Sequence, residues 1–186
     1  MSPNVIWSIG VSLDGYIAGP NGEIDWSAPD EELHRFHNEQ ARELGAQLCG
    51  RALYEAMLPW ENRAGDPAWG EPELEFARLW QALEKVVFSR TLETVEGKAR
   101  LARGDVAEEI ARLKGEPGGD IGVGGAGLAA ACIEQGLVDE FRLFVSPVVL
   151  GGGTPCFPAL DRRVDLDLVE TRTFGSRVVY TRYRRA

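Results

Sequence analysis

The sequence contains few residues of the kinds that bind metals or form disulfides. Its three cysteines, Cys49, Cys132 and Cys156, lie far apart and form no Cys-x-x-Cys pair. Such cysteines are typical of reduced, buried thiols in a cytosolic protein. The two histidines, His34 and His37, stand three residues apart on a predicted helix, with no further nitrogen or sulfur ligand at metal-binding spacing. We therefore expect surface histidines and no metal.

Positive charge and long hydrophobic runs are also scarce. The 186 residues include 20 Lys and Arg against 29 Asp and Glu, which gives a net charge of −9. Such a surface repels nucleic acid and anionic lipid, so we expect neither as a partner. An anionic cofactor would need local arginines and backbone amides to hold it. Residues 1–4 include no basic segment and no long apolar run follows, so we expect no signal peptide, no transmembrane span and a cytoplasmic location.

Segments of β type alternate with helical segments along the chain. Hydrophobic residues make up 44% of the sequence, enough for one domain that buries roughly 70% of its unfolded surface. We predict a single α/β domain over residues 1–186, with a central, mostly parallel sheet flanked by helices and a C-terminal antiparallel hairpin. The predicted strands are 5–11, 46–49, 85–88, 99–101, 121–123, 141–150, 164–173 and 177–183, and the predicted helices are 28–44, 52–57, 73–83, 106–114 and 128–133.

Residues 119–128, Gly-Asp-Ile-Gly-Val-Gly-Gly-Ala-Gly-Leu, predict a strand, a glycine turn and the start of a helix. Glycines let the backbone approach an anion, and the N–H groups at a helix start bind it, so this pattern is typical of a phosphate site. Gly122, Gly124 and Gly127 also match Gly-x-Gly-x-x-Gly, but the acids that follow fall at the wrong end of the next strand for the usual dinucleotide-binding domain. The alternative is a turn whose glycines only allow a helix and a strand to pack closely.

Two further strand ends carry groups that favour anions. Gly50-Arg51 links a strand to a helix, and Ser89-Arg90 follows the next strand. Ligands gather at the carboxyl ends of parallel strands, so these residues and the glycine turn should lie along one edge of the sheet. Two helix starts suit a pyrophosphate, and a Ser–Arg pair suits the 2′-phosphate of NADP. The alternative for Arg51 is a solvated residue at a helix end.

Four motifs resemble the dihydrofolate-reductase-like fold. They are Ser-Leu-Asp-Gly-Tyr-Ile-Ala at 12–18, Gly-Arg-Ala-Leu-Tyr-Glu at 50–55, Ser-Arg-Thr at 89–91 and Gly-Gly-Ala-Gly-Leu at 124–128. Gly-Leu-Val-Asp-Glu at 136–140, with the segment 147–158, is most similar to the branch named for the RibD C-terminal domain, the riboflavin-biosynthesis reductases. The resemblance implies NADPH as the cofactor, hydride transfer to a small heterocycle, and a homodimer.

The resemblance also implies which residues form the site. Ala18 and Ile24 would border the nicotinamide, and Asp14, Trp26 and Glu31 would face the substrate. The residues implied to hold NADPH are Ala18, Ile24, Gly50, Arg51, Leu53, Ser89, Arg90, Val123, Gly124, Gly125, Ala126, Gly127 and Leu128.

Asp14 and Glu31 are the candidate catalytic residues. The acceptor gains negative charge as hydride arrives, so a nearby acid with a raised pKa would help by supplying a proton. In the dihydrofolate reductases an acid follows a Trp and a Pro at the spacing of Trp26, Pro29 and Glu31. The alternatives are a turn-forming role for Asp14 and an ordinary helix N-terminal role for Glu31.

The sequence departs from the resembled families on the substrate side. Val123 stands where the riboflavin-pathway reductases have an acid, Tyr16 where they have Lys or Arg, and Leu53 where dihydrofolate reductases have Thr. The expected substrate is a 5-amino-6-(5-phosphoribosylamino)uracil-type or pterin-like compound. The alternatives are a dihydrofolate reductase and a non-catalytic NADP(H)-binding domain.

A homodimer is also favoured by the expected sheet edges. Val145, Val148 and the C-terminal hairpin carry alternating apolar residues. An uncovered edge invites pairing with another chain, so a second copy is the expected partner.

Overall fold

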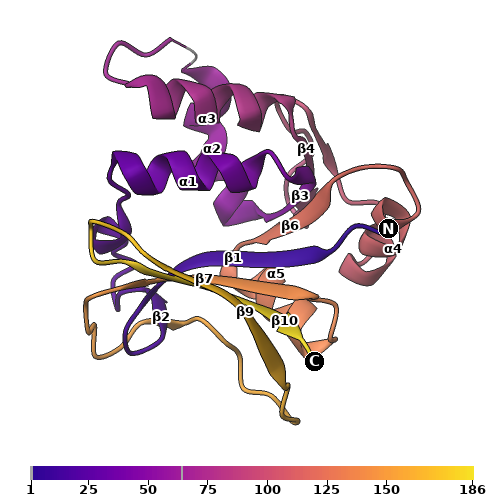
Figure 1. Cartoon of the computed structure of the whole chain (residues 1–186). Coiled ribbons are helices and arrows are strands. Elements are labelled where there is room, and N and C mark those ends of the chain that lie inside the picture. The colour runs from indigo at the N-terminus through magenta and orange to yellow at the C-terminus, as the bar shows by residue number, and fades with distance from the viewer. Residues whose placement is uncertain (1, 64) are drawn as a thin grey trace.

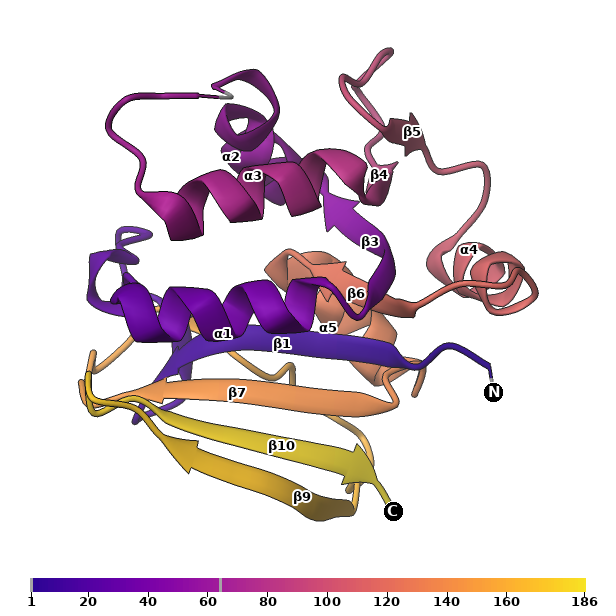
Figure 2. The same ribbon diagram turned by 45° about the horizontal axis from the view of Figure 1, so that its top comes forward.

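One eight-stranded sheet runs through the protein (Figures 1 and 2). The computed structural model describes residues 2–63 and 65–186. The strand order is β5-β4-β3-β6-β1-β7-β10-β9; the first six strands are parallel, and β10 is antiparallel to both β7 and β9. This confirms the predicted α/β sheet with its antiparallel C-terminal hairpin. Its strands are β1 (Val5–Ser12), β3 (Leu44–Gly50), β4 (Glu84–Phe88), β5 (Ala99–Leu101), β6 (Asp120–Gly124), β7 (Glu140–Ser146), β9 (Leu166–Thr173) and β10 (Val179–Arg185).

Five α-helices and a small second sheet complete the described part of the chain. The second sheet pairs β2 (Tyr16–Ala18) with β8 (Thr154–Pro155) in antiparallel fashion. The helices are α1 (Glu31–Ala41), α2 (Arg51–Asn62), α3 (Glu71–Ala82), α4 (Val106–Lys114) and α5 (Ala126–Glu134), with one 3-10 turn, η1 (Asp25–Ser27). No helix among the described residues has the length and apolar character needed to cross a bilayer.

Helices α4 and α5 cover one face of the sheet. Successive side chains of a strand point to opposite faces, and in β1 the buried Val5 and Trp7 point to this side. They join Val106 and Ile110 of α4 and Cys132 of α5 in the largest hydrophobic cluster. Burial of this cluster is the main stabilising contribution on this face.

Helices α1, α2 and α3 lie on the opposite face and divide it between them (Figure 2). Leu33 of α1 packs against Phe144 of β7 and Tyr180 of β10. In a separate cluster, Tyr54 of α2 and Trp80 of α3 pack against Cys49 of β3 and Val87 of β4. Strand β6 runs between these two clusters in the sheet order. Gly122 and Gly124 of β6 face this side and have no side chain, so the strand contributes no bulk there toward its carboxyl end.

The first helix begins later than the sequence predicts. Residues 25–27 form the 3-10 turn η1, and α1 begins at Glu31. Its N-cap is Asp30, whose carboxylate accepts a hydrogen bond from the Leu33 N–H at 2.9 Å. The expected start at residue 28 is therefore wrong, because a carboxylate cap after Pro29 satisfies the first turn.

Two other boundaries also differ from expectation. The helix predicted over 52–57 continues through Pro59 to Asn62 as α2, so the aromatic Trp60 belongs to it. Strand β7 ends at Ser146, directly before Pro147. The strand predicted over 141–150 is therefore too long: β7 lies between β1 and β10, and a residue without an N–H cannot continue such a strand.

Candidate functional site

The glycine turn after β6 forms an exposed helix start. Gly125, the N-cap of α5, has a φ of +96°, a conformation that favours glycine. The first helical hydrogen bond runs from the Ala129 N–H to the Gly125 carbonyl at 2.9 Å. The N–H groups of residues 126–128 come before the first helical hydrogen bond, so they have no carbonyl partner within the helix. Ala126 and Gly127 are exposed, so these donors are open to a ligand.

The junction between β3 and α2 lies directly beside this turn. A Cβ placed on Gly125 would lie 3.5 Å from the Cα of Gly50, the N-cap of α2. A Cβ on Gly124 would lie 2.1 Å from Cδ2 of Leu53, so the Leu53 side chain occupies the space over Gly124. The starts of α2 and α5 therefore meet at the carboxyl ends of two paired strands. This adjacency follows from parallel pairing and is the arrangement expected from the sequence.

The third expected group follows β4, the neighbour of β3. Arg51 donates a hydrogen bond to Oγ1 of Thr91 and pairs with Glu55 at 2.8 Å. The Oγ of Ser89 accepts hydrogen bonds from the N–H groups of Thr91 at 3.2 Å and Leu92 at 3.0 Å. Arg51 therefore bridges the β3 and β4 ends, and both it and Arg90 are exposed.

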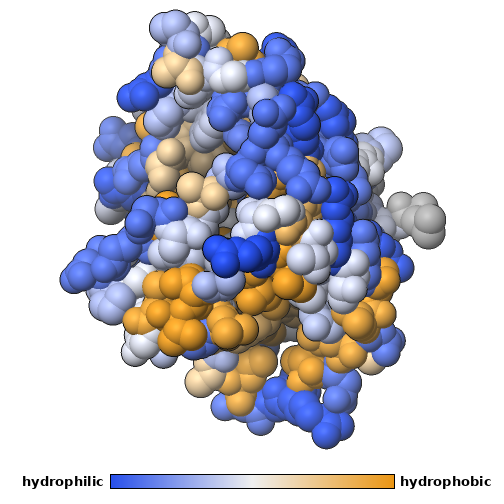
Figure 3. All heavy atoms as spheres, turned by 60° about the vertical axis from the view of Figure 1, so that its left-hand side comes forward, coloured by the Kyte–Doolittle hydropathy of each residue, from blue (hydrophilic) through white to orange (hydrophobic). Residues whose placement is uncertain are grey.

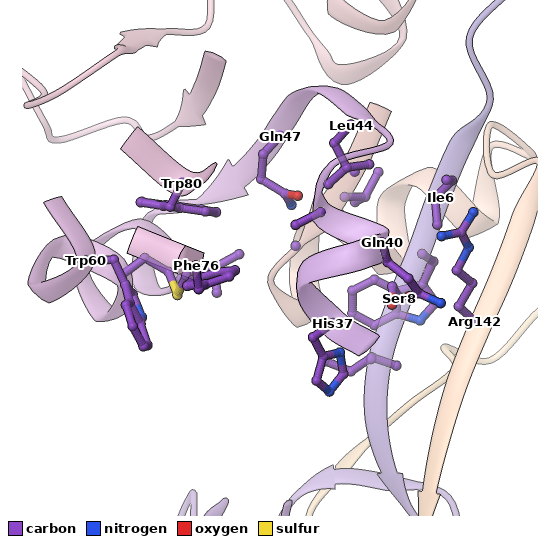
Figure 4. Close-up of a pocket in the computed structure, with 18 of the residues that line it drawn as sticks. Ile6, Ser8, His37, Gln40, Leu44, Gln47, Trp60, Phe76, Trp80 and Arg142 are labelled. Carbon is purple, nitrogen blue, oxygen red and sulfur yellow. The ribbon is translucent and has the colours of Figure 1, made fainter. Parts of the chain in front are cut away.

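A cavity of about 590 Å³ opens beside the two glycine junctions (Figure 4). It lies on the sheet face covered by α1, α2 and α3. Strand β6 contributes Gly122 and Gly124 to its lining. Val123, Gly124, Gly125 and Leu53 line it and so connect it to the cofactor residues implied by the sequence. Its other described lining residues are Ile6, Trp7, Ser8, Ile9, Pro29, His34, His37, Gln40, Ala41, Leu44, Gln47, Met57, Trp60, Glu73, Phe76, Trp80, Gly122 and Arg142.

The two ends of the cavity differ in character. Trp60, Phe76 and Trp80 gather at one end, and Gln40 and Arg142 lie together at the other (Figure 4). The rings of Trp60 and Phe76 meet edge to face with centroids 4.8 Å apart. The Arg142 guanidinium pairs with Glu140 at 2.6 Å and with Glu43 at 2.8 Å. The cavity thus offers aromatic walls and a polar end whose charge is already paired.

The histidines line this cavity and are not surface residues, so that expectation is wrong. His34 and His37 stand on the same side of α1, and the His37 ring lies 4.3 Å from that of Phe144. Burial lowers the pKa of His37 to about 4, with a further lowering from His34. Burial also lowers the pKa of His34, against the opposing effect of Glu73, whose carboxylate oxygen lies 3.8 Å from Nδ1 of His34. The imidazole of His37 is therefore neutral at neutral pH.

Asp14 fastens one loop to another. Its carboxylate accepts hydrogen bonds from the N–H groups of Leu150 at 3.0 Å and Gly151 at 2.7 Å, and from the Ser12 hydroxyl at 2.7 Å. These bonds, led by that from Leu150, lower the pKa of Asp14. A carboxyl with a lowered pKa is ionised at neutral pH, which is the opposite of what a proton donor needs. The geometry matches the turn-forming alternative.

Trp26 and Glu31 stand apart from the cavity lining. The Trp26 indole donates to the Glu23 carbonyl at 3.0 Å, and Glu31 pairs with Arg35 at 2.9 Å with 72% of its side chain exposed. Among the described residues that line the cavity, Asp14, Trp26 and Glu31 are absent. The structure therefore does not bring these three side chains together around one ligand.

Ala18 and Ile24 lie in the excursion after β1. Ala18 pairs with Thr154 in the small second sheet, and Ile24 is 60% exposed. Leu13 and Val149 are similarly exposed, and the Leu13 N–H donates to the Val148 carbonyl at 2.8 Å. Hydrophobic side chains gather over the lower half of the face seen in Figure 3. An apolar surface is therefore available near the end of β1.

All three cysteines are buried, as expected, and burial raises the pKa of Cys49 and Cys132 to about 12 and that of Cys156 to about 11. Within residues 2–63 and 65–186, no group of three or more His, Cys, Asp and Glu residues is placed to hold a metal ion.

Sequence reasoning missed most of the cavity wall. Trp60 and Phe76 come from two helices that meet only in the folded chain, and Arg142 comes from β7. A signal was present for the α1 residues: His34, His37 and Ala41 recur at helical spacing on one side of the helix.

Two curated relatives match almost the whole chain. The uncharacterized protein YyaP of Bacillus subtilis is 38% identical over 180 residues, covering 96% of this chain and 93% of that protein. The uncharacterized protein YwjB of the same organism is 31% identical over 186 residues, covering 96% of each.

Solved structures share the fold. A putative riboflavin biosynthesis protein from Shewanella sp. PV-4 superposes with a TM-score of 0.76 at 24% identity, covering 100% of this chain and 99% of that one. A diaminohydroxyphosphoribosylaminopyrimidine deaminase/5-amino-6-(5-phosphoribosylamino)uracil reductase from Thermotoga maritima gives 0.70 at 18% identity, covering 100% of this chain and 57% of that one. Dihydrofolate reductase from Enterococcus faecalis, complexed with NADP(H) and RAB-propyl, gives 0.62 at 17% identity, covering 98% and 96%.

The family follows from the match along the chain. The fold is dihydrofolate-reductase-like, as these superpositions show. The family model of the RibD C-terminal domain matches residues 3–180. With that match and a relative at 38% identity, the chain belongs to the RibD C-terminal domain family.

Proposed function

We propose that this protein is an NADPH-dependent reductase that transfers hydride to a small, flat heterocycle. One observation supports this most strongly: two helix starts meet at adjacent parallel strand ends, and the cavity beside them is lined by Leu53, Gly124 and Gly125. A dinucleotide needs anion-binding donors next to a closed space for its reactive ring. This arrangement offers both within one connected region.

The residues present fit such a cofactor. The positive φ of Gly125 turns the chain so that the N–H groups of residues 126–128 point outward, and a Cβ on Gly127 would contact nothing within 4 Å. The open side of α5 can therefore accept a pyrophosphate. Arg51 and Arg90, at the neighbouring strand ends, are placed to pair with a further phosphate.

The reaction needs one hydride and one proton for each substrate. Bound NADPH would supply the hydride and leave as NADP⁺. In this proposal the protein orients the two reactants and excludes water, which the aromatic wall of Trp60, Phe76 and Trp80 suits. Neither candidate acid is well placed as the proton source: the bonds to Asp14 hold its carboxyl in the ionised form, and Glu31 pairs with Arg35 away from the cavity lining. The proton therefore comes from water in this proposal.

The family resemblance implies two substrate classes: 5-amino-6-(5-phosphoribosylamino)uracil-type compounds and pterin-like compounds. Both are flat and carry N–H groups at one edge, which suits aromatic walls and the amides of Gln40 and Gln47. A compound of the first class appears in the name of the Thermotoga maritima neighbour, a 5-amino-6-(5-phosphoribosylamino)uracil reductase. Turnover of dihydrofolate would favour the alternative of a dihydrofolate reductase. Binding of NADPH without turnover of any tested heterocycle would favour a non-catalytic domain.

Cofactor preference tests the proposal directly. A charge-assisted pair between Arg90 and the 2′-phosphate should contribute about 1.5–3 kcal/mol, which is roughly ten- to a hundredfold in affinity. We expect binding titrations to favour NADPH over NADH by that factor, and Arg90→Ala to lose most of the difference. Arg163→Ala is the control, because Arg163 is 84% exposed in the segment before β9. Equal affinity of the wild-type protein for both cofactors would contradict the preference.

A further inference from the structure

The charges around the cavity point to a narrower substrate class. We propose that the cavity binds an aromatic compound that carries no phosphate, so that the natural substrate is an unphosphorylated heterocycle. This inference rests on the proposed reductase function. It separates the protein from the Thermotoga maritima neighbour, whose name places a phosphoribosyl group on its substrate.

The described lining contains one arginine, and its charge is already paired. Arg142 is 5% exposed and pairs with Glu140 at 2.6 Å and Glu43 at 2.8 Å. Glu140, itself 3% exposed, also pairs with Arg184 at 3.1 Å. To bind a phosphate, Arg142 would have to give up its pairs with Glu140 and Glu43, and breaking the buried pair with Glu140 costs free energy. Arg142 therefore supports the polar end of the cavity without offering a phosphate site.

Acidic residues surround the outer side of the cavity. A second cavity of about 310 Å³ adjoins the first and shares Pro29, His34 and Glu73 with it. Its acidic lining residues are Asp30, Glu31, Glu71 and Glu73, and its one described arginine is Arg35. Arg35 is paired with Glu31 at 2.9 Å. A phosphate dianion placed here would face an excess of negative charge.

The histidines do not reverse this balance. His34 and His37 line the cavity, and Glu73 is the carboxylate closest to His34, at 3.8 Å from Nδ1. His37 contacts Phe144 on its other side, with ring centroids 4.3 Å apart. A neutral imidazole donates or accepts a hydrogen bond but does not neutralise a phosphate.

The rings at the aromatic end of the cavity pack against one another and suit a flat, uncharged ligand. Trp60 stacks on Trp69 with centroids 4.8 Å apart and planes at 27°, and Phe76 meets Trp60 at 81°. Trp80 stacks on Phe76 at 6.1 Å. Such supported rings bind an aromatic ligand with little loss of conformational freedom. A volume of about 590 Å³ also lies within the range of cavities that bind small organic ligands.

Matched pairs of compounds that differ only in the phosphate test the proposal. The probes are 5-amino-6-(ribosylamino)uracil with its 5′-phosphate, and riboflavin with flavin mononucleotide, supplemented by uncharged pterins. Quenching of the fluorescence of Trp60 and Trp80 reports occupancy, with and without saturating NADPH. We expect the unphosphorylated member of at least one pair to bind at least tenfold more tightly. Equal or tighter binding of the phosphorylated members, or failure of every uncharged compound to bind, would overturn the proposal.

A charge reversal at the shared acid sharpens the test. Glu73→Lys should move the preference of a binding pair toward its phosphorylated member by about five- to tenfold, because a cation replaces an anion beside the cavity. Glu134→Lys makes the same charge change at an exposed position on α5, on the other face of the sheet, and should leave the preference unchanged. An equal shift in both variants would show that net charge alone sets the preference. NADPH binding and NADPH oxidation with the tested heterocycles, measured separately, test the reductase function itself, so the two proposals can fail independently.

Discussion

Single glycines determine how closely the elements of the site approach one another. A Cβ on Gly122 would lie 2.1 Å from Oε1 of Gln47, and a Cβ on Gly124 would lie 2.1 Å from Cδ2 of Leu53. Both positions therefore contribute to close packing, which was the alternative explanation for the glycine-rich stretch. Gly127 is different, because its missing Cβ faces open space. The stretch thus combines packing glycines in β6 with an open glycine at the start of α5.

His37 should make stability depend on pH. Its folded-state pKa of about 4 lies below the usual 6.5. The unfolded chain therefore binds more protons between these values, and the free energy of unfolding should fall as the pH is lowered from about 6.5 toward 4. The loss should approach about 3 kcal/mol. Thermal unfolding of wild type and His37→Asn at pH 7 and pH 5 checks this. The variant should lose less stability, and equal losses would show that His37 is not the titrating group.

At the scale of secondary-structure elements, the sequence predicts a helix boundary best where a single capping residue sets it. Asp105 and Glu108 form a reciprocal capping box, and α4 spans Val106–Lys114 as predicted. The start of α1 differs from the prediction because Ser27 and Asp30 both suit an N-cap, and only the contacts made by the preceding turn distinguish them. Ser27 lies against β1, 3.4 Å from the position of a Cβ on Gly10. Such contacts between distant segments cannot be derived from local periodicity.

The candidate site likewise combines features that local sequence predicts with features that depend on contacts between distant segments. The adjacency of the strand ends at Gly50, Ser89 and Gly124 could be predicted, because parallel strands place their carboxyl ends on one edge of a sheet. The cavity could not, because its walls come from α1, α2 and α3, whose approach depends on tertiary packing. Asn38 of α1 fixes part of that approach by donating to the Pro72 carbonyl and to Glu75, each at 2.9 Å.

The homodimer expected from the sequence would form through the C-terminal strands. Val145 was expected at a sheet edge, and this is wrong because β7 is flanked by β1 and β10. The edge strand at this end of the sheet is β9. Leu168 and Val169 of β9 are 57% and 40% exposed. We predict a dimer through this end of the sheet, because exposed apolar edge strands favour association. Sedimentation at micromolar concentration should show a dimer that Leu168→Glu weakens, whereas a monomeric wild type would contradict it.

At the scale of the whole molecule, the net charge of −9 opposes any anionic ligand. An NADPH site on such a protein has to depend on local donors: the starts of α2 and α5, with Arg51 and Arg90 at the neighbouring strand ends. These groups lie on one edge of the sheet, whereas Asp30, Glu31, Glu71 and Glu73 gather around the outer cavity between α1 and α3. Electrostatics would therefore direct the cofactor phosphates to the first region and away from the second.

The central claim is that the glycine turn before α5 holds the cofactor pyrophosphate, and one pair of variants tests it most directly. Gly127→Val and Gly118→Val both add a side chain where a Cβ would meet nothing within 4 Å, so both proteins should fold. Only Gly127 lies in the first turn of α5. In NADPH titrations we expect Gly127→Val to lose at least tenfold in affinity, because the added side chain blocks the helix N–H groups, while Gly118→Val binds like wild type. Wild-type affinity in a folded Gly127→Val protein would place the cofactor elsewhere and contradict the account.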